Sequence, residues 1–261
     1  MASLLTSSSV GGGADDAEER QLLMSRLGSG RGGSIISTEA VSSPTSSGFV
    51  SGSLDDDEER QVGVTAGGNA ATDDDPHDPD AARRRLRYEM LCRRAQEEDL
   101  SSVQDTSCIY LAGTDGQGRQ VVVFIGKWFK PGQVDLEKAL LYLIRLVGPA
   151  AESGEYVVVY FHTRTSRDNT PHYWWMKEVY NTLTYAYKKN LKAFYVVHPT
   201  MWAKLTCWWF STFMAPAIKN KIHYVRALEE LKASMDPKAL SIPMFIEEQD
   251  MTFNGLRYYQ P

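Results

Sequence analysis

The chain has 261 residues and a formal net charge of −5, with charge and aromatic residues unevenly distributed. Residues 1–82 carry 15 acidic and 4 basic residues, whereas residues 83–261 carry 18 acidic and 24 basic residues. Three scattered cysteines argue against a disulfide framework or a zinc site. Without a leader-like start or an apolar run of about 18 residues, we expect a cytoplasmic protein with no spanning helix.

Residues 1–82 are rich in Ser, Gly and Asp, with acidic runs at Asp55–Glu59 and Asp73–Asp75. Such a segment buries too little apolar surface to offset the entropy lost on ordering. We therefore predict a disordered acidic tail over residues 1–82 and a single domain over residues 83–261. Ala17–Leu27 could form a short helix that docks on a partner, although a fluctuating segment is favoured there.

The order of predicted elements indicates an α/β fold, a sheet flanked by helices. In chain order we predict a helix over residues 83–98, strands over 108–112 and 120–124, a helix over 134–147, a strand over 156–161, a helix over 170–187, a strand over 191–197, an apolar helix over 201–214, a strand over 222–225, a short helix around 228–231, and a strand or extended segment over 242–246.

Local signals set the ends of these elements. Asp115-Gly116 predicts a hairpin turn, because both residues tolerate positive φ. Gly148-Pro149 is expected to stop the second helix, and Thr170-Pro171 to cap and begin the third. Pro243 lacks a backbone N–H, so the last extended segment is expected at a sheet edge.

We find no motif of a catalytic site, a metal site, a phosphate loop or a nucleic-acid-binding module, so no enzyme activity, cofactor or nucleic acid is expected. His162 and His198 each follow an apolar strand, at the sheet edge where open α/β folds bind ligands. Each is interpreted either as a polar group facing a pocket or partner, or as a residue that ties down the loop after its strand. The second reading is favoured, since no nucleophile or metal set lies nearby.

Met201–Met214 is an unusually apolar, tryptophan-rich stretch of about 14 residues, too short to span a membrane. An apolar face this wide must be buried in protein, cover a ligand cavity, or lie in a membrane interface. An ordinary core helix and a helix with one of the other two roles are about equally favoured.

Several segments together carry a family resemblance: Tyr156–Ser166, Tyr187–Thr200 and Lys221–Val225, supported by Asp135–Tyr142 and Glu98–Leu100. They resemble the divergent CRAL-TRIO, or BCH-type, domain over roughly residues 86–259. The resemblance implies a sheet with a lipid-sized cavity and a gate helix. It also implies non-enzymatic roles, either lipid binding or the scaffolding of small GTPases and their regulators.

Two functional hypotheses follow. In the first, the domain binds a phospholipid, another hydrophobic ligand or a membrane surface, with the gate at Met201–Met214. The candidate pocket and gate residues are Tyr160, His162, Tyr195, His198, Trp202, Leu205, Trp209 and Phe213. In the second, side chains fill the pocket and the domain is a protein-interaction scaffold. Its candidate contacts with an acidic partner or surface are Lys188, Lys189 and Lys192.

Overall fold

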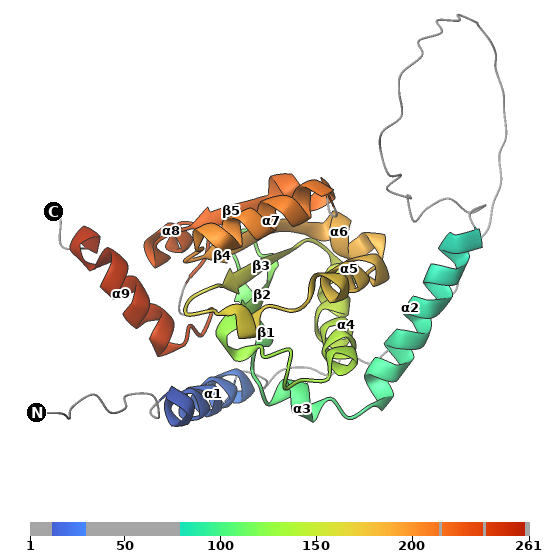
Figure 1. Ribbon diagram of the computed structural model, residues 1–261, viewed down its shortest axis with the longest axis horizontal. Coiled ribbons are helices and arrows are strands. Elements are labelled where there is room, and N and C mark those ends of the chain that lie inside the picture. Colours follow the sequence, from blue (N-terminus) through green and yellow to red (C-terminus); the bar gives the residue numbers. More distant parts are fainter. Residues whose placement is uncertain (1–11, 30–78, 214–215, 237–238, 259–261) are drawn as a thin grey trace, which may run out of the picture.

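The computed structural model describes residues 12–29, 79–213, 216–236 and 239–258. The described part contains a five-stranded sheet with helices on both faces (Figure 1). The strand order is β1-β2-β3-β4-β5; β1 and β2 are antiparallel, and β2 to β5 run parallel. The α/β sheet flanked by helices is therefore confirmed. The acidic runs of the predicted tail lie outside the described residues.

The five strands form where the sequence predicts strands. Their bounds are β1 Ile109–Thr114, β2 Gln120–Ile125, β3 Tyr156–Phe161, β4 Leu191–Val197 and β5 Ile222–Val225. The β1–β2 turn forms at the expected place: the Asp115 carboxylate accepts hydrogen bonds from the amides of Gln117 and Arg119, and Gly118 supplies a positive φ of 78°. Tyr156 and Val157, neighbours on β3 that face opposite sides of the sheet, are both buried, as expected of a central strand covered on both faces.

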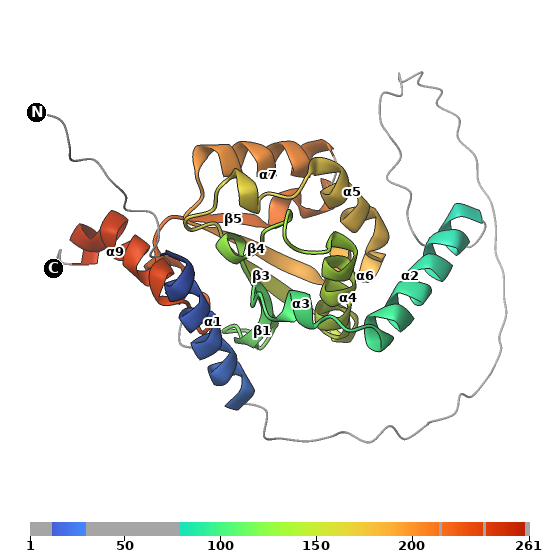
Figure 2. The same cartoon turned by 60° about the horizontal axis from the view of Figure 1, so that its bottom comes forward.

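One face of the sheet is covered by the helices that connect the parallel strands: α4 Leu136–Ser153, α5 Tyr173–Thr182, α6 Tyr185–Asn190 and α7 Met201–Phe213. The Tyr156 hydroxyl of β3 donates to the carbonyl of Tyr187 in α6. The Asn190 amide donates to the carbonyl of Ala151, which holds α6 against α4. Figure 2 shows α5 and α7 side by side above the sheet.

Two predicted helix boundaries on this face are wrong. α4 continues through Gly148-Pro149 to Ser153, because Ala150 and Ala151 after the proline are buried and this packing outweighs the lost backbone hydrogen bond. The third helix begins at Tyr173 with His172 as its N-cap, because Thr170 instead ends the 3-10 turn η2 (Arg167–Asn169): its amide donates to the carbonyl of Arg167 and its hydroxyl to that of Ser166. It also divides into α5 and α6 at Leu183, which is extended.

The opposite face packs against the chain after β5. α8 spans Leu228–Lys232, α9 spans Met244–Tyr258, and the Tyr110 hydroxyl donates to the carbonyl of Leu240 between them. The strand or extended segment predicted over residues 242–246 is wrong, because α9 begins at Met244. Pro243 comes just before the helix, where a missing N–H costs nothing, and its carbonyl accepts from Ile246.

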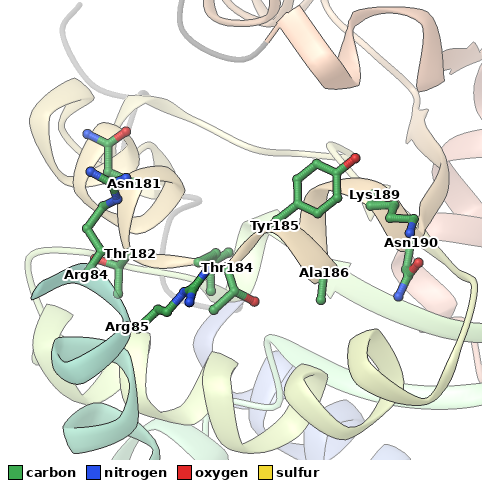
Figure 3. A pocket seen from close by; sticks show the side chains of 10 residues that line it. Arg84, Arg85, Asn181, Thr182, Thr184, Tyr185, Ala186, Lys189 and Asn190 are labelled. Atoms are coloured by element: carbon green, nitrogen blue, oxygen red, sulfur yellow. The ribbon is translucent and has the colours of Figure 1, made fainter. Parts of the chain in front are cut away.

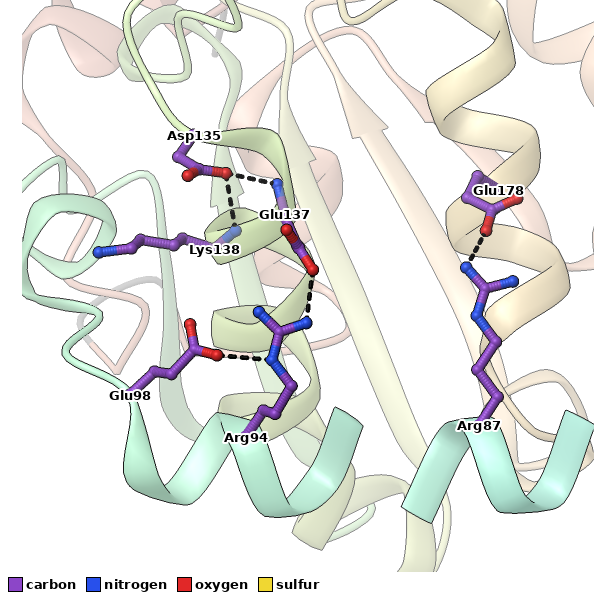
Figure 4. Close-up of polar contacts among 7 residues, drawn as sticks. All are labelled: Arg87, Arg94, Glu98, Asp135, Glu137, Lys138 and Glu178. Atoms are coloured by element: carbon purple, nitrogen blue, oxygen red, sulfur yellow. Dashed lines mark hydrogen bonds and ion pairs between the residues drawn. The ribbon is translucent and has the colours of Figure 1, made fainter. Parts of the chain in front are cut away.

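α2 (Pro79–Glu97) leads into the short α3 (Ser101–Gln104) and is held to the sheet helices by ion pairs (Figure 4). The Arg94 guanidinium contacts Glu98 at 2.6 Å and Glu137 of α4 at 2.5 Å. Further along α2, Arg87 pairs with Glu178 of α5. These pairs fix the orientation of α2 more than they stabilise the fold, because exposed ion pairs contribute at most about 1 kcal/mol.

The sequence left the segment around residue 20 as a fluctuating stretch, but the structure has a helix there. α1 spans Gly12–Ser29 and lies across the start of α9 (Figure 2). Leu23 is buried and Leu27 packs against the core. Residues 12–29 therefore differ from the disordered tail predicted over residues 1–82. This helix forms because it packs against the domain, and the amino-acid composition of the tail does not reveal that packing.

Candidate lipid-binding surface

Aromatic side chains gather near the carboxyl ends of the parallel strands, on the face that α5 and α7 cover. Tyr160 of β3 lies between Phe124 of β2, with ring centroids 5.3 Å apart, and Phe194 of β4, at 6.4 Å. Phe129 extends this group, 5.7 Å from Phe124, and Trp175 of α5 stacks on it at 5.9 Å. We call these five residues the aromatic layer. All except Phe129 are only partly buried.

A tight turn supports the aromatic layer from below. The turn is η1 (Gly126–Trp128), which follows β2 directly. A Cβ atom on Gly126 would lie 2.9 Å from the hydroxyl of Tyr160 and 2.7 Å from Thr165 Oγ1, so only glycine fits there. The Asn169 amide donates to the carbonyls of Lys127 and Phe129, at 2.8 and 3.0 Å, and thereby fixes the turn.

Among the side chains of α7 that the structure describes, small residues lie inward and large apolar residues outward. Ala203 and Ser211 are buried and Cys207 between them is partly buried, a spacing of four residues, and burial raises the pKa of the Cys207 thiol to about 11. On the other side of the helix, five large apolar residues have exposed fractions between 42% and 79%: Met201, Trp202, Leu205, Trp208 and Trp209. A helix has 3.6 residues per turn, which puts the two sets on opposite faces.

The exposed apolar area continues onto α5. Trp209 packs edge-on against Tyr173 with ring centroids 4.9 Å apart, and the neighbouring Trp174 is exposed. We call the set Trp174, Met201, Trp202, Leu205, Trp208 and Trp209 the α7 surface. The candidates Trp202, Leu205 and Trp209 thus lie on the outer side of α7 rather than over the aromatic layer. The side chain of Phe213 lies outside the described residues.

His162 connects the aromatic layer to the first turn of α7. Its Nδ1 lies 3.0 Å from the Tyr160 hydroxyl and its Nε2 lies 3.2 Å from Thr200 Oγ1. Thr200 Oγ1 in turn accepts from the amide of Ala203, so Thr200 caps α7. Burial lowers the pKa of His162, which favours the neutral ring.

His198 has the structural role that the sequence favoured and does not face a pocket. Its Nδ1 lies 2.8 Å from Thr163 Oγ1, and its Nε2 lies 2.9 Å from Asp250 Oδ1 of α9. The order Thr163–His198–Asp250 is that of a nucleophile–base–acid triad. The His198 and Asp250 side chains are only 4% exposed and Thr163 is buried as well, so all three groups are shielded from solvent here. The chain of contacts anchors α9 to the end of β4.

Tyr195 is separated from the aromatic layer by the sheet itself. In the β3–β4 register Tyr195 pairs with Val159, whereas Tyr160 pairs with Val196. Paired residues share a face and neighbours along a strand alternate, so Tyr195 and Tyr160 lie on opposite faces. Tyr195 packs instead near His223, at 5.3 Å between ring centroids. The two candidate tyrosines therefore do not line one pocket.

The candidate lysines lie near the end of α6. Lys188 and Lys189 lie over the rings of Tyr180 and Tyr185, and Lys192 pairs with Glu155 at 2.7 Å. Lys189 also borders a pocket of about 440 Å³ between α2 and α6 (Figure 3). The other residues that line this pocket are Arg84, Arg85, Asn181, Thr182, Leu183, Thr184, Tyr185, Ala186 and Asn190. We call it the basic pocket, because two arginines and a lysine line it and no aspartate or glutamate does.

The described part of the chain holds no group of three or more His, Cys, Asp or Glu side chains placed to bind a metal ion. Nor is any helix there both long and apolar enough to cross a membrane.

Comparison with known proteins identifies the family. The model of the "Divergent CRAL/TRIO domain" family matches residues 118–252, which include β2 to β5 and the whole α7 surface. The chain belongs to this family. Its divergent CRAL/TRIO domain supports the lipid-binding type of module that the resemblance implied.

The relatives agree with this assignment. "Protein GDAP2 homolog" of Drosophila melanogaster is 55% identical over 175 residues, 67% of this chain and 32% of the relative. The homolog of Nematostella vectensis is 38% identical over 174 residues (67% and 34%). "Ganglioside-induced differentiation-associated protein 2" of Homo sapiens is 40% identical over 168 residues (64% and 33%). The segments quoted for the family resemblance also resemble this protein, and the identity confirms that likeness; the chain spans about a third of the length of these relatives.

A solved structure also aligns with the chain. The alignment with the crystal structure of Sfh5 covers 58% of this chain and 67% of the Sfh5 chain, with a TM-score of 0.40 and 16% sequence identity.

The sequence missed several residues of this site. Phe124, Phe129, Trp175 and Phe194 belong to the aromatic layer, and Trp174 belongs to the α7 surface. The alternation of side chains along a strand was the signal available for Phe194, because it lies one residue before Tyr195 and therefore faces the other way. No local pattern places Trp174 beside α7.

Proposed function

We propose that this divergent CRAL/TRIO domain binds hydrophobic lipid at a membrane surface through α7, in the cytoplasm and without catalysing a reaction. One observation carries the proposal: the five large apolar side chains of α7 that the structure describes are exposed, while its small residues Ala203 and Ser211 are buried. A helix that served only the core would have the opposite arrangement, because burying large apolar side chains contributes most to stability.

The chemistry of the α7 surface fits a lipid interface. Tryptophan favours the boundary between hydrocarbon and headgroups, because its ring is apolar and its N–H requires a polar partner. Cations lie beside the apolar residues: Lys177 Nζ is 5.4 Å from the Trp174 ring and Lys204 Nζ is 5.7 Å from the Tyr224 ring. Such lysines would meet anionic headgroups as the aromatic rings enter the interface.

The aromatic layer beneath α7 supplies a place for an acyl chain. Ala203 and Cys207 contribute little side-chain volume to the inner face of α7, and every ring of the aromatic layer except Phe129 is only partly buried. Movement of α7 away from the sheet would uncover Phe124, Tyr160 and Phe194 together. The contact of His162 with Thr200 marks the end of α7 about which such a movement would turn.

The test measures binding to vesicles of phosphatidylcholine with and without phosphatidylserine. Leu205 is 52% exposed, so its insertion contributes about 1 kcal/mol and Leu205→Ser should weaken binding roughly fivefold. Adding Trp202→Ser should bring the loss to roughly 30- to 100-fold. The matched control is Leu86→Ser on α2, where the leucine is 60% exposed.

The two leucine variants distinguish binding through α7 from nonspecific hydrophobic adsorption to the vesicles. Both leucines are exposed, so neither variant should change the free energy of unfolding by more than about 0.5 kcal/mol. Equal loss of vesicle binding in the Leu205 and Leu86 variants would contradict a role for α7. Unchanged binding in the Trp202/Leu205 double variant would contradict the proposed function itself.

The basic pocket favours a second candidate function, the scaffolding of an acidic protein such as a small GTPase or its regulator. Arg84, Arg85 and Lys189 bring three cations to its lining, and no carboxylate is among the residues that line it. Complementary charge steers a partner and fixes its orientation. This surface is separate from α7, so a partner could bind there while lipid is bound at α7.

A further inference from the structure

α1 contacts the domain through one face of the helix. Its less exposed side chains recur with the spacing of an amphipathic helix: Asp16, Glu19, Arg20, Leu23, Met24 and Leu27. The adjacent leucines show how sharply the faces differ, because Leu22 is 52% exposed and Leu23 only 3%. α1 is therefore seated in one rotational position on the domain.

The acidic side chains of this face have specific partners. Asp16 pairs with Lys127 of η1 at 2.5 Å, and both side chains are less than a quarter exposed. The Glu19 carboxylate accepts a hydrogen bond of 3.0 Å from the amide of Phe245, in the first turn of α9. A carboxylate there satisfies a free N–H and interacts favourably with the positive end of the helix dipole.

The apolar and cationic contacts lie directly beside these. The Arg20 guanidinium lies 5.5 Å from the ring of Trp128, and Trp128 packs 5.8 Å from Phe245. Lys127 Nζ lies 4.4 Å above the Phe245 ring, so the same lysine serves both the ion pair and the aromatic contact. We call Lys127, Trp128 and Phe245 the α1 docking surface.

We propose that the α1 docking surface is a binding site for an acidic amphipathic helix, occupied in this chain by its own residues 12–29 and open to a second helix of the same pattern once α1 leaves. The pattern is a carboxylate at positions i and i+3 and leucine at i+7 and i+11, as in Asp16, Glu19, Leu23 and Leu27. An 18-residue helix is marginal by itself in water, so α1 folds as it docks and exchanges with competitors. This proposal does not rest on the proposed lipid-binding function.

The experiment uses the full chain and a fluorescein-labelled peptide of residues 12–29, with binding followed by fluorescence anisotropy. Leu23→Asp should release α1 and leave the docking surface vacant, whereas Leu22→Asp should leave α1 in place. We expect saturable peptide binding to the Leu23→Asp chain, at least tenfold tighter than to the wild-type or Leu22→Asp chain. Hydrogen exchange of α1 should rise in the Leu23→Asp chain only.

Charge exchange identifies the site. A peptide carrying Asp16→Lys should bind the vacant chain weakly, and binding should return when the chain also carries Lys127→Glu. Equal peptide binding by the wild-type and Leu23→Asp chains would place the peptide elsewhere and overturn the proposal.

Hydrogen exchange of β2 to β4 reports whether the core remains folded. If Leu23→Asp disturbs it, a chain with Asp16→Lys and Glu19→Lys provides the vacant surface instead. An intact core with no peptide binding to either vacated chain would also overturn the proposal.

Discussion

Asp250 is a position at which a single polar substitution should destabilise the fold strongly. Its Oδ1 accepts from His198 Nε2 at 2.9 Å, from the amide of Leu228 at 3.0 Å and from the Asn254 amide at 2.8 Å. These donors come from the end of β4, the start of α8 and α9. Asp250 itself is only 3% exposed, so water does not replace it when it is removed.

Asp250→Ala should therefore lower the free energy of unfolding by about 3–5 kcal/mol, because it leaves buried donors without an acceptor. For a domain of this size the midpoint of thermal unfolding should fall by roughly 10 °C. Asp250→Asn keeps one oxygen acceptor and should cost about half as much. Urea unfolding followed by tryptophan fluorescence measures both variants, with equal m-values as the check for two-state behaviour.

The comparison of the two variants tests the reasoning. If Asp250→Ala costs less than about 1 kcal/mol, the buried donors have found other partners and the anchoring role of His198 is refuted. If Asp250→Asn costs as much as the alanine variant, the negative charge matters rather than the acceptor geometry.

Two further predictions concern His162, which contacts Thr200 at the start of α7, and the basic pocket. Burial lowers the pKa of His162 below its usual 6.5, so its neutral form contributes stability that is complete above pH 6.5 and declines as the pH falls toward the lowered pKa. The stability lost on His162→Gln, measured by urea unfolding, should thus shrink from pH 7.5 to pH 5.5; a loss that grows with acidity would contradict this. At the basic pocket, Lys189→Glu should reduce capture of an acidic partner protein, measured as a lower association rate that is less sensitive to salt. Lys192→Glu serves as its control, since Lys192 already has an acidic neighbour, and equal effects of the two reversals would remove the pocket from the interface.

The sheet was predictable from sequence because its signals are local. β3 and β4 are continuous apolar runs, and the β1–β2 turn forms at the expected Asp115-Gly116, although the glycine with positive φ is Gly118 rather than Gly116. The helix ends were less predictable where tertiary contacts decide them. Pro149 is accepted inside α4 because the alanines after it are buried, a fact that only the packing of α6 provides.

The orientation of α7 could not be read from composition. Large apolar residues normally mark the buried face of a helix, so Trp202, Leu205 and Trp209 were predicted to cover a pocket. In the structure the buried positions are Ala203, Cys207 and Ser211, whose spacing of four was visible in the sequence but is common in any helix. Which face is inward depends on the close approach of α7 to the sheet.

The docking of α1 was unpredictable for a similar reason. Its inner face includes several charged residues. The prediction of disorder therefore followed the polar, acidic composition of residues 1–82 rather than the two leucines of this face. Only the positions of Lys127 and of the first turn of α9 give Asp16 and Glu19 their partners.

The three-residue turn η1 is in contact with both proposed binding sites. On one side Gly126 leaves no space between its backbone and Tyr160, and on the other Lys127 and Trp128 hold α1. A ligand that pushes the Tyr160 ring toward Gly126 would displace this turn, and displacement of the turn would shift Lys127 and Trp128 beneath α1. The two affinities would then be thermodynamically linked: whatever factor lipid imposes on the docking of residues 12–29, that docking imposes on lipid in return.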